Sequence, residues 1–149
     1  MNKIDDIVKL FMEELKEKAQ VQFVDCTKTE SKVTLTIDPV SRLFIEIEES
    51  GITVLYADEH DNFWLKPYKN EKAFIDDVTK FVIRLLHNNI LIEYFYSGSV
   101  LVRYRIYTID NATNYKKLLK TSTVSLNPFL WLLPKSTTSK VICFNSNTK

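Results

Sequence analysis

Near the start of the chain, apolar residues recur at intervals of three and four, as in a helix with one buried face. Asp5 and Asp6 lie in the first turn of this pattern, and Lys16 and Lys18 lie in the last. Acids at the beginning and bases at the end complement the helix dipole. The pattern predicts an amphipathic helix that buries Ile4, Ile7, Val8, Phe11 and Leu15.

Between residues 21 and 65 the pattern changes to alternation of apolar and polar residues. Five short segments alternate in this way, and turn-forming stretches separate them: "KTES", "DPVS", "ESG" and "DEHDN". Connections this short join neighbouring antiparallel strands. The sequence therefore predicts a five-stranded antiparallel meander with these inward residues: Val21 and Phe23; Val33, Leu35 and Ile37; Leu43, Ile45 and Ile47; Ile52, Val54 and Tyr56; Phe63 and Leu65.

A second helical pattern follows Asn70, whose side chain can accept a hydrogen bond from the first turn. This helix ends at "HNN" and is more apolar than the first, so it is expected to lie against the sheet as the central packing element. Its predicted buried stripe consists of Phe74, Val78, Phe81, Val82 and Leu85.

The last third of the chain begins with "ILIEYFYSGSVLVRYRIYT", which predicts a hairpin with Gly98 in its loop. "NATNYKKLLK" fits a short helix, "VICF" fits a last strand, and "STTSK" fits a polar loop. We expect an α+β fold in one domain of residues 1–149: an N-terminal helix, an antiparallel meander, a long apolar helix packed on the sheet, a hairpin that extends it and a less regular C-terminal part.

The scarcity of glycine excludes several common enzyme classes. Gly51 and Gly98 are the two glycines of the chain, so neither GxGxxG nor GxxxxGK[ST] occurs. "SGS" at residues 97–99 has glycine where a nucleophile elbow needs serine. The sequence therefore disfavours the common nucleotide-binding classes and the α/β-hydrolases, and no cofactor is expected.

Location and redox chemistry follow from the same composition. The first eighteen residues carry charges throughout and so lack the apolar region of a signal peptide. The apolar run "LNPFLWLLP" is too short to span a bilayer. Cys26 and Cys143 are too far apart for a CxxC motif. We expect a cytoplasmic protein with two reduced cysteines and no membrane partner.

The densest group of reactive side chains is "DEHD" at residues 58–61. A metal site needs three or four ligands at suitable spacing, and the two histidines of the chain, His60 and His87, cannot supply a histidine-rich set. We interpret "DEHD" as a charged hairpin turn and His87 as a helix-terminal residue. No metal is expected. A Cys–His pair assembled by the fold stays open as an alternative, although no local signature supports it.

Charge is distributed unevenly along the chain. Residues 1–77 hold 10 Lys and Arg against 17 Asp and Glu, a net charge of −7, whereas residues 78–149 hold 10 against 2, a net charge of +8. The two halves could interleave and neutralise each other, or they could form an acidic and a basic surface that selects a partner. The candidate partner-binding residues are Glu46, Glu48, Glu49, Arg103, Arg105, Lys116, Lys117 and Lys120.

These observations favour a small non-catalytic binding protein that acts through a protein–protein surface. An immunity or antitoxin partner of a bacterial toxin is one version, and the abundance of Asn and Lys is typical of a low-GC bacterium or its phage.

Two alternative functions stay open. One is an enzyme whose site is assembled from scattered residues, which an anion pocket beside Arg103 with a histidine would favour. The other is a nucleic-acid or regulatory module that uses Arg103, Arg105 and "YKKLLK", although the net charge of +1 disfavours a dominant phosphate-binding face. "PFLWLL" is the apolar contact to consider if charge does not carry recognition.

Overall fold

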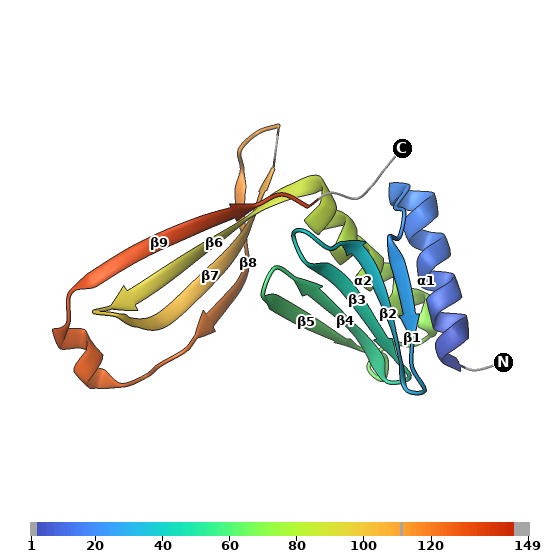
Figure 1. Cartoon of the computed structure of the whole chain (residues 1–149), viewed down its shortest axis with the longest axis horizontal. Helices are drawn as coiled ribbons and strands as arrows, with labels where there is room; N and C mark the ends of the chain where they lie inside the picture. Colours follow the sequence, from blue (N-terminus) through green and yellow to red (C-terminus); the bar gives the residue numbers. More distant parts are fainter. Residues whose placement is uncertain (1–2, 111, 145–149) are drawn as a thin grey trace. The chain divides into compact units, whose positions relative to one another are not determined.

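The computed structural model describes residues 3–110 and 112–144, and its contacts divide the chain into two compact units. The first unit is Met1–Leu86 with Phe144–Lys149, and the second is His87–Cys143. Two helices and two antiparallel sheets confirm the α+β class (Figure 1). This division by contacts does not test the expectation of one domain for residues 1–149, which stays a prediction.

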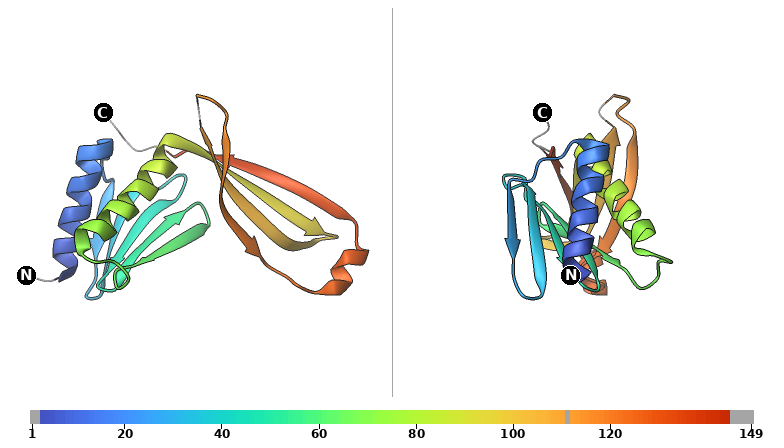
Figure 2. Two further views of the ribbon diagram at one scale, coloured as in Figure 1. Left: turned by 180° about the vertical axis from the view of Figure 1, so that it is seen from behind. Right: turned by 90° about the vertical axis from the view of Figure 1, so that its right-hand side faces the viewer.

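Two helices cover one face of the first sheet, as the views from both sides show (Figure 2). Helix α1, Lys3–Ala19, buries the predicted face apart from Val8, which is half-buried. Helix α2, Glu71–His87, begins where Asn70 accepts a hydrogen bond from the Ala73 N–H at 2.9 Å. Neither helix has the length and apolar character needed to cross a bilayer, over the residues that the structure describes.

The first sheet is the predicted meander, with neighbours in the order β1-β2-β3-β4-β5. Alternate residues of its central strands are fully buried, among them Ile45 on β3 and Val54 on β4. The alternating pattern therefore identified the buried face correctly. The strands are β1 (Asp25–Lys28), β2 (Lys32–Asp38), β3 (Leu43–Glu48), β4 (Gly51–Tyr56) and β5 (Glu59–Trp64).

Two boundaries of the meander differ from the prediction. No strand forms around Val21 and Phe23, because the chain turns back at Gln20 (φ 54°) and the Val21 N–H donates to the Leu15 carbonyl, so β1 begins only at Asp25. The "DEHDN" stretch is mostly strand. The left-handed backbone of Ala57 (φ 55°) closes the hairpin early, and β5 begins at Glu59.

The predicted hairpin is confirmed as β6 (Asn88–Ser97) and β7 (Val100–Asp110), with Gly98 at φ 60° in its turn. The hairpin does not extend the first sheet. It forms the centre of a second, four-stranded sheet in the order β8-β7-β6-β9.

The C-terminal part is more regular than predicted. The expected helix in "NATNYKKLLK" (residues 111–120) does not form: Lys116–Thr123 make up strand β8 along β7. Lys135–Ile142 form β9 along β6, including the expected loop "STTSK". Long unpaired edges of the central hairpin offer backbone hydrogen bonds that override the local preference of these polar segments. A short 3₁₀ helix, η1 (Pro128–Leu132), lies between β8 and β9.

Helix α2 supplies the first prediction. Phe74 is fully buried, whereas Phe81, expected in the core, is half-buried and contacts the rings of Tyr56 and Phe63 at centroid distances of 5.9 and 5.2 Å. Phe74→Ala should therefore cost about 3–5 kcal/mol of unfolding free energy, and Phe81→Ala about 1–2 kcal/mol, because less apolar surface is lost. Urea unfolding of both variants measures this order. Equal losses would contradict the assigned helix face.

The second prediction concerns the contact between the helices. Asp76 on α2 binds Lys18 of α1 and Lys80 of α2, each at 2.8 Å, and these hydrogen bonds lower the pKa of Asp76 from 3.8 to about 2. Because the folded-state pKa is depressed, the stabilisation is complete above about pH 4 and is lost as the pH falls to about 2.

Asp76→Asn should therefore unfold more easily than the parent at about pH 7, and the difference should fade toward about pH 2. Chemical unfolding of both proteins across this pH range measures the effect. Glu30→Gln, which removes an exposed carboxylate in the turn between β1 and β2, is the matched control. A constant Asp76→Asn difference over the whole range would show that charge does not carry this contact.

Candidate interaction surface on the second sheet

One extra residue in β7 decides which side chains share a face of the second sheet. Near the turn, Leu101 opposes Tyr96, but from there on Phe95 opposes Arg103 and Glu93 opposes Arg105, so Val102 is a bulge. Opposed residues of antiparallel strands project to the same side. We call the side that carries Phe95, Glu93, Arg103, Arg105, Tyr107 and Lys116 the cationic face.

Cations of the cationic face lie over aromatic rings. The guanidinium carbons of Arg103 and Arg105 are 4.8 and 5.4 Å from the centre of the Phe95 ring. The Lys116 ammonium is 4.1 Å from the Tyr107 ring and 3.1 Å from a Glu93 carboxylate oxygen. Such cation–π contacts stabilise by about 0.5–1 kcal/mol at exposed positions and fix where the charges sit.

The second unit has few acids to balance its cations. Residues 87–143 contain 7 Lys and Arg against 2 Asp and Glu, a net charge of +5. Glu93 pairs with Lys116 rather than with Arg105, which lies opposite it. Asp110 accepts hydrogen bonds from the backbone N–H groups of Thr113 and Ala112, which hold its pKa below the usual value. Among the described residues, no carboxylate pairs with Arg103 or Arg105.

Beside the cationic face, the connection between β8 and β9 exposes large apolar side chains. Residues 126–133, here called the apolar segment, contain η1, where the Asn127 side chain accepts a hydrogen bond from the Phe129 N–H at 3.1 Å. The Lys135 ammonium donates to the Leu130 carbonyl at 2.9 Å and to Ser97 Oγ at 2.8 Å. The most exposed members are Leu126 (88%), Phe129 (76%), Trp131 (78%) and Leu132 (84%).

A cleft of about 440 Å³ lies where the apolar segment meets the cationic face. Its lining includes Phe95, Arg103, Trp131 and Lys135 together with hydroxyl-bearing Ser and Thr residues. We call it the Arg103 cleft. The Nε atom of Arg103 is buried and has no hydrogen-bond partner within the described ranges.

Histidine, cysteine and carboxylate side chains of the described residues do not gather at this cleft. Its lining contains no His, Cys, Asp or Glu. His60 belongs to β5 and His87 ends α2. The pocket beside Arg103 is therefore present, but the histidine that would favour the enzyme interpretation is not part of it.

The structure separates the basic residues that sequence analysis grouped together. Arg103, Arg105 and Lys116 share the cationic face. Lys117 opposes Thr108 and Lys120 opposes Ile106, which places both on the other side of the sheet. Of the predicted basic group, three residues can thus act as one surface.

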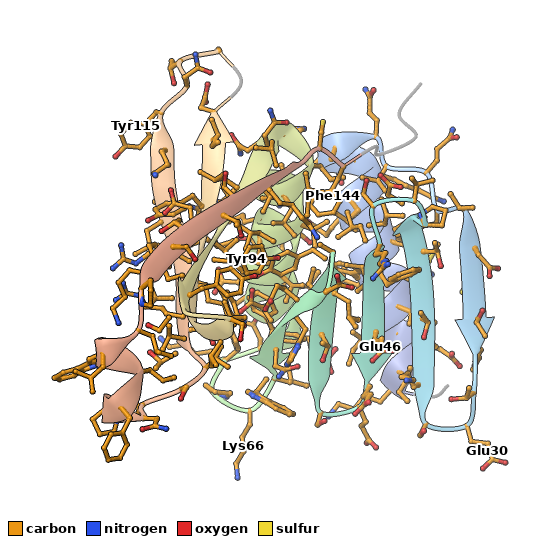
Figure 3. The ribbon with its side chains drawn as sticks, turned by 60° about the vertical axis from the view of Figure 1, so that its left-hand side comes forward. Glu30, Glu46, Lys66, Tyr94, Tyr115 and Phe144 are labelled. Carbon is orange, nitrogen blue, oxygen red and sulfur yellow. The ribbon has the colours of Figure 1, made fainter. Side chains whose placement is uncertain are left out.

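The predicted acidic residues belong to the first unit, which carries 13 Lys and Arg against 17 Asp and Glu, a net charge of −4. Glu46 lies on β3 and pairs with Lys32 at 3.1 Å, and Figure 3 shows it on the first sheet. Glu48 and Glu49 are exposed where β3 turns into β4. The charge asymmetry of the sequence thus follows the division into units.

Two important residues of the site escaped sequence analysis: Phe95 and Lys135. The "PFLWLL" run did indicate an apolar contact that includes Trp131. Phe95 could not be paired with Arg103 without knowing of the bulge. Lys135 was expected in an irregular region, so its contacts with Ser97 and Leu130 had no sequence signal.

Metal ligands do not cluster in the structure. Within residues 3–110 and 112–144, no three His, Cys, Asp or Glu side chains lie close enough to hold an ion. In "DEHD", Asp58 stays in the turn and pairs with Arg42, while Asp61 on β5 accepts a hydrogen bond from the Tyr56 hydroxyl. Cys26 and Cys143 are both exposed.

No protein-family model, curated protein or solved structure matches the chain. Its function is therefore argued from the site alone.

The third prediction tests how the apolar segment is held. Lys135→Met removes the ammonium that bonds to Leu130 and Ser97. The Leu133 N–H, which donates to the Leu130 carbonyl at 3.2 Å, should then exchange with solvent at least about tenfold faster, because the segment opens locally more often. Hydrogen exchange measured by NMR reports this amide individually.

The control for this experiment is Lys140→Met. Lys140 lies on the same strand, β9, and is exposed, but it opposes Ile92 far from η1. Its substitution should leave Leu133 exchange unchanged. If both variants exchange like the parent, Lys135 does not anchor the segment.

Proposed function

We propose that this protein is a non-catalytic binding protein that contacts a partner protein through the apolar segment and the cationic face. The observation that carries the proposal is the exposure of Leu126, Phe129, Trp131 and Leu132 directly beside arginines without an internal acid. Single exposed apolar residues are ordinary, but a contiguous group marks an interaction site. Trp and Arg are also the residues that most often dominate binding energy.

The surface is held in place before binding, which supports the proposal. Asn127 and Lys135 fix η1, and the Val102 carbonyl accepts hydrogen bonds from the N–H groups of Val124 and Ser125 at 2.8 and 3.2 Å. The Phe95 ring restrains Arg103 and Arg105. This surface then loses less conformational entropy on binding, so more of the contact energy appears as affinity.

The two alternative functions, a nucleic-acid-binding module and an enzyme, gain less support from the structure. Base stacking needs open aromatic rings, and on the cationic face Phe95 and Tyr107 already have cations over them. Residues 121–134 carry no charge, whereas nucleic-acid interfaces are strongly positive. Enzymes most often use His, Asp or Glu as the general base, and the described lining of the Arg103 cleft has none of these, while the ammonium of Lys135 donates to Ser97 and Leu130.

A narrower version of the proposal is an immunity or antitoxin protein that neutralises a bacterial toxin. Two features support it: units of opposite net charge, which suit selective pairing, and a cleft whose described lining has no His, Cys, Asp or Glu. In this version the partner is made in the same cell, and its activity falls when it is bound.

The fourth prediction tests the surface. The double substitution Phe129→Ala and Trp131→Ala should weaken the complex by about 3 kcal/mol or more, roughly a hundredfold, because two large anchors are truncated. Affinity purification from the source cell identifies the partner, and calorimetry with purified components measures the affinity. Val40→Ala, at a valine that is 89% exposed in the first unit, is the matched control and should change nothing.

Association rates measured across a salt series distinguish the contributions of the predicted basic and acidic residues to binding. Reversing Lys116, Lys117 and Lys120 should slow association and make it less sensitive to salt, because the second unit loses positive charge. Reversing Glu46, Glu48 and Glu49 in the first unit should have the smaller effect. A complex that is insensitive to the Phe129 and Trp131 changes but weakened by the acidic set would place the contact on the first unit and contradict the proposal.

A further inference from the structure

We infer that the Arg103 cleft receives an acidic side chain of the partner, an Asp or Glu flanked by apolar residues, with its carboxylate on Arg103. This inference rests on the proposed function and specifies the chemistry of the partner. It makes the partner's contact segment acidic and apolar together.

The second unit contains only two acidic residues, Glu93 and Asp110, and neither is available to Arg103. Glu93 is held by Lys116, and Asp110 is held by backbone N–H groups beyond the end of β7. Arg103 is left with a ring contact and with a buried Nε that has no acceptor in the described part of the chain. A carboxylate in the cleft would bind the rest of the guanidinium through charge-assisted hydrogen bonds, which are about twice as strong as neutral ones.

The two cations that line the cleft differ in their hydrogen-bond partners. Lys135 also lines it, but its ammonium already donates to Ser97 and Leu130. Arg103 is therefore the one lining cation without a polar partner among the described residues. The planar guanidinium of Arg103 matches the planar shape of a carboxylate, with which it can form two parallel hydrogen bonds.

The Arg103 cleft is larger than a carboxylate, and part of its wall is apolar. A volume of about 440 Å³ exceeds what one carboxylate fills, and Phe95, Leu126 and Trp131 supply apolar walls around it. The Glu or Asp must therefore arrive with apolar neighbours. The adjoining exposed Phe129 and Leu132 extend the same apolar surface.

NMR titration of the ¹⁵N-labelled full chain tests the inference directly. The probes are the blocked tripeptides Ac-Leu-Glu-Leu-NH₂ and Ac-Leu-Gln-Leu-NH₂, inorganic phosphate and a short oligothymidylate. The Glu peptide should shift the Nε–H signal of Arg103 and the indole N–H signal of Trp131, with an affinity about tenfold or more above that of the Gln peptide. Equal affinities for the two peptides would overturn the inference.

The other probes distinguish other anions. If phosphate or the oligothymidylate moves the Arg103 signal at lower concentration than the Glu peptide, the cleft selects phosphate groups and the carboxylate assignment is wrong. Arg103→Lys keeps the charge but loses the planar fork, so it should reduce affinity for the Glu peptide about tenfold while the melting temperature stays close to that of the parent. Lys140→Met, on the other side of the sheet, should bind the peptide like the parent.

The inference and the proposed function can fail separately. If neither peptide binds but the Phe129 and Trp131 variants still weaken the partner complex, the surface is correct and the carboxylate assignment is wrong. If the Glu peptide binds in the cleft while the partner ignores the Phe129 and Trp131 changes, the cleft is a carboxylate site outside the partner contact, and the proposed function falls.

Discussion

The bulge at Val102 is the constraint on which the candidate site depends. Without the extra residue, the register near the Gly98 turn would continue and would set Phe95 opposite Val102 and Arg103 opposite Tyr94. A shift by one residue moves every later side chain to the other face. The bulge therefore brings the arginines to Phe95. Its carbonyl also accepts the N–H groups of Val124 and Ser125, so the same residue anchors the start of the connection that carries the apolar segment.

A second constraint is electrostatic. With 7 basic and 2 acidic residues in the second unit, ion pairing cannot satisfy every cation, whatever the fold. Arg103 and Arg105 instead lie over the Phe95 ring, and Lys116 lies over the Tyr107 ring in addition to its ion pair with Glu93; aromatic rings attract a cation without accepting a strong hydrogen bond. Guanidinium groups held in this way keep N–H donors for a partner. The arrangement stabilises the free protein less than internal salt bridges with good geometry would, and it suits recognition of an external acid.

How much could be predicted depended on whether a signal was local. The helices and the meander follow from periodicity, and the Asn70 cap follows from residue type, so these predictions were confirmed. The helix prediction for "YKKLLK" was wrong because the segment has helical spacing, whereas the open edge of β7 decided its conformation as strand β8. In the site, alternation along the strand predicted that Arg103 and Arg105 share a face. It could not predict that Phe95 lies beside them, because a bulge leaves no mark in the pattern of apolar and polar residues.

Sheet topology explains why the apolar segment lies beside the arginines. Strands β8 and β9 form opposite edges of the second sheet, so their connection must pass from one edge to the other around the end of the β6–β7 hairpin (Figure 1). At that end the Gly98 N–H donates to the Pro134 carbonyl at 2.8 Å, and a Cβ on Gly98 would meet the Leu133 side chain at 3.1 Å. Gly98 thus permits the close approach that fixes the segment at the turn. Because the bulge lies four residues further along β7, Arg103 and Trp131 line one cleft, and a partner that covers the apolar segment must also meet a cation.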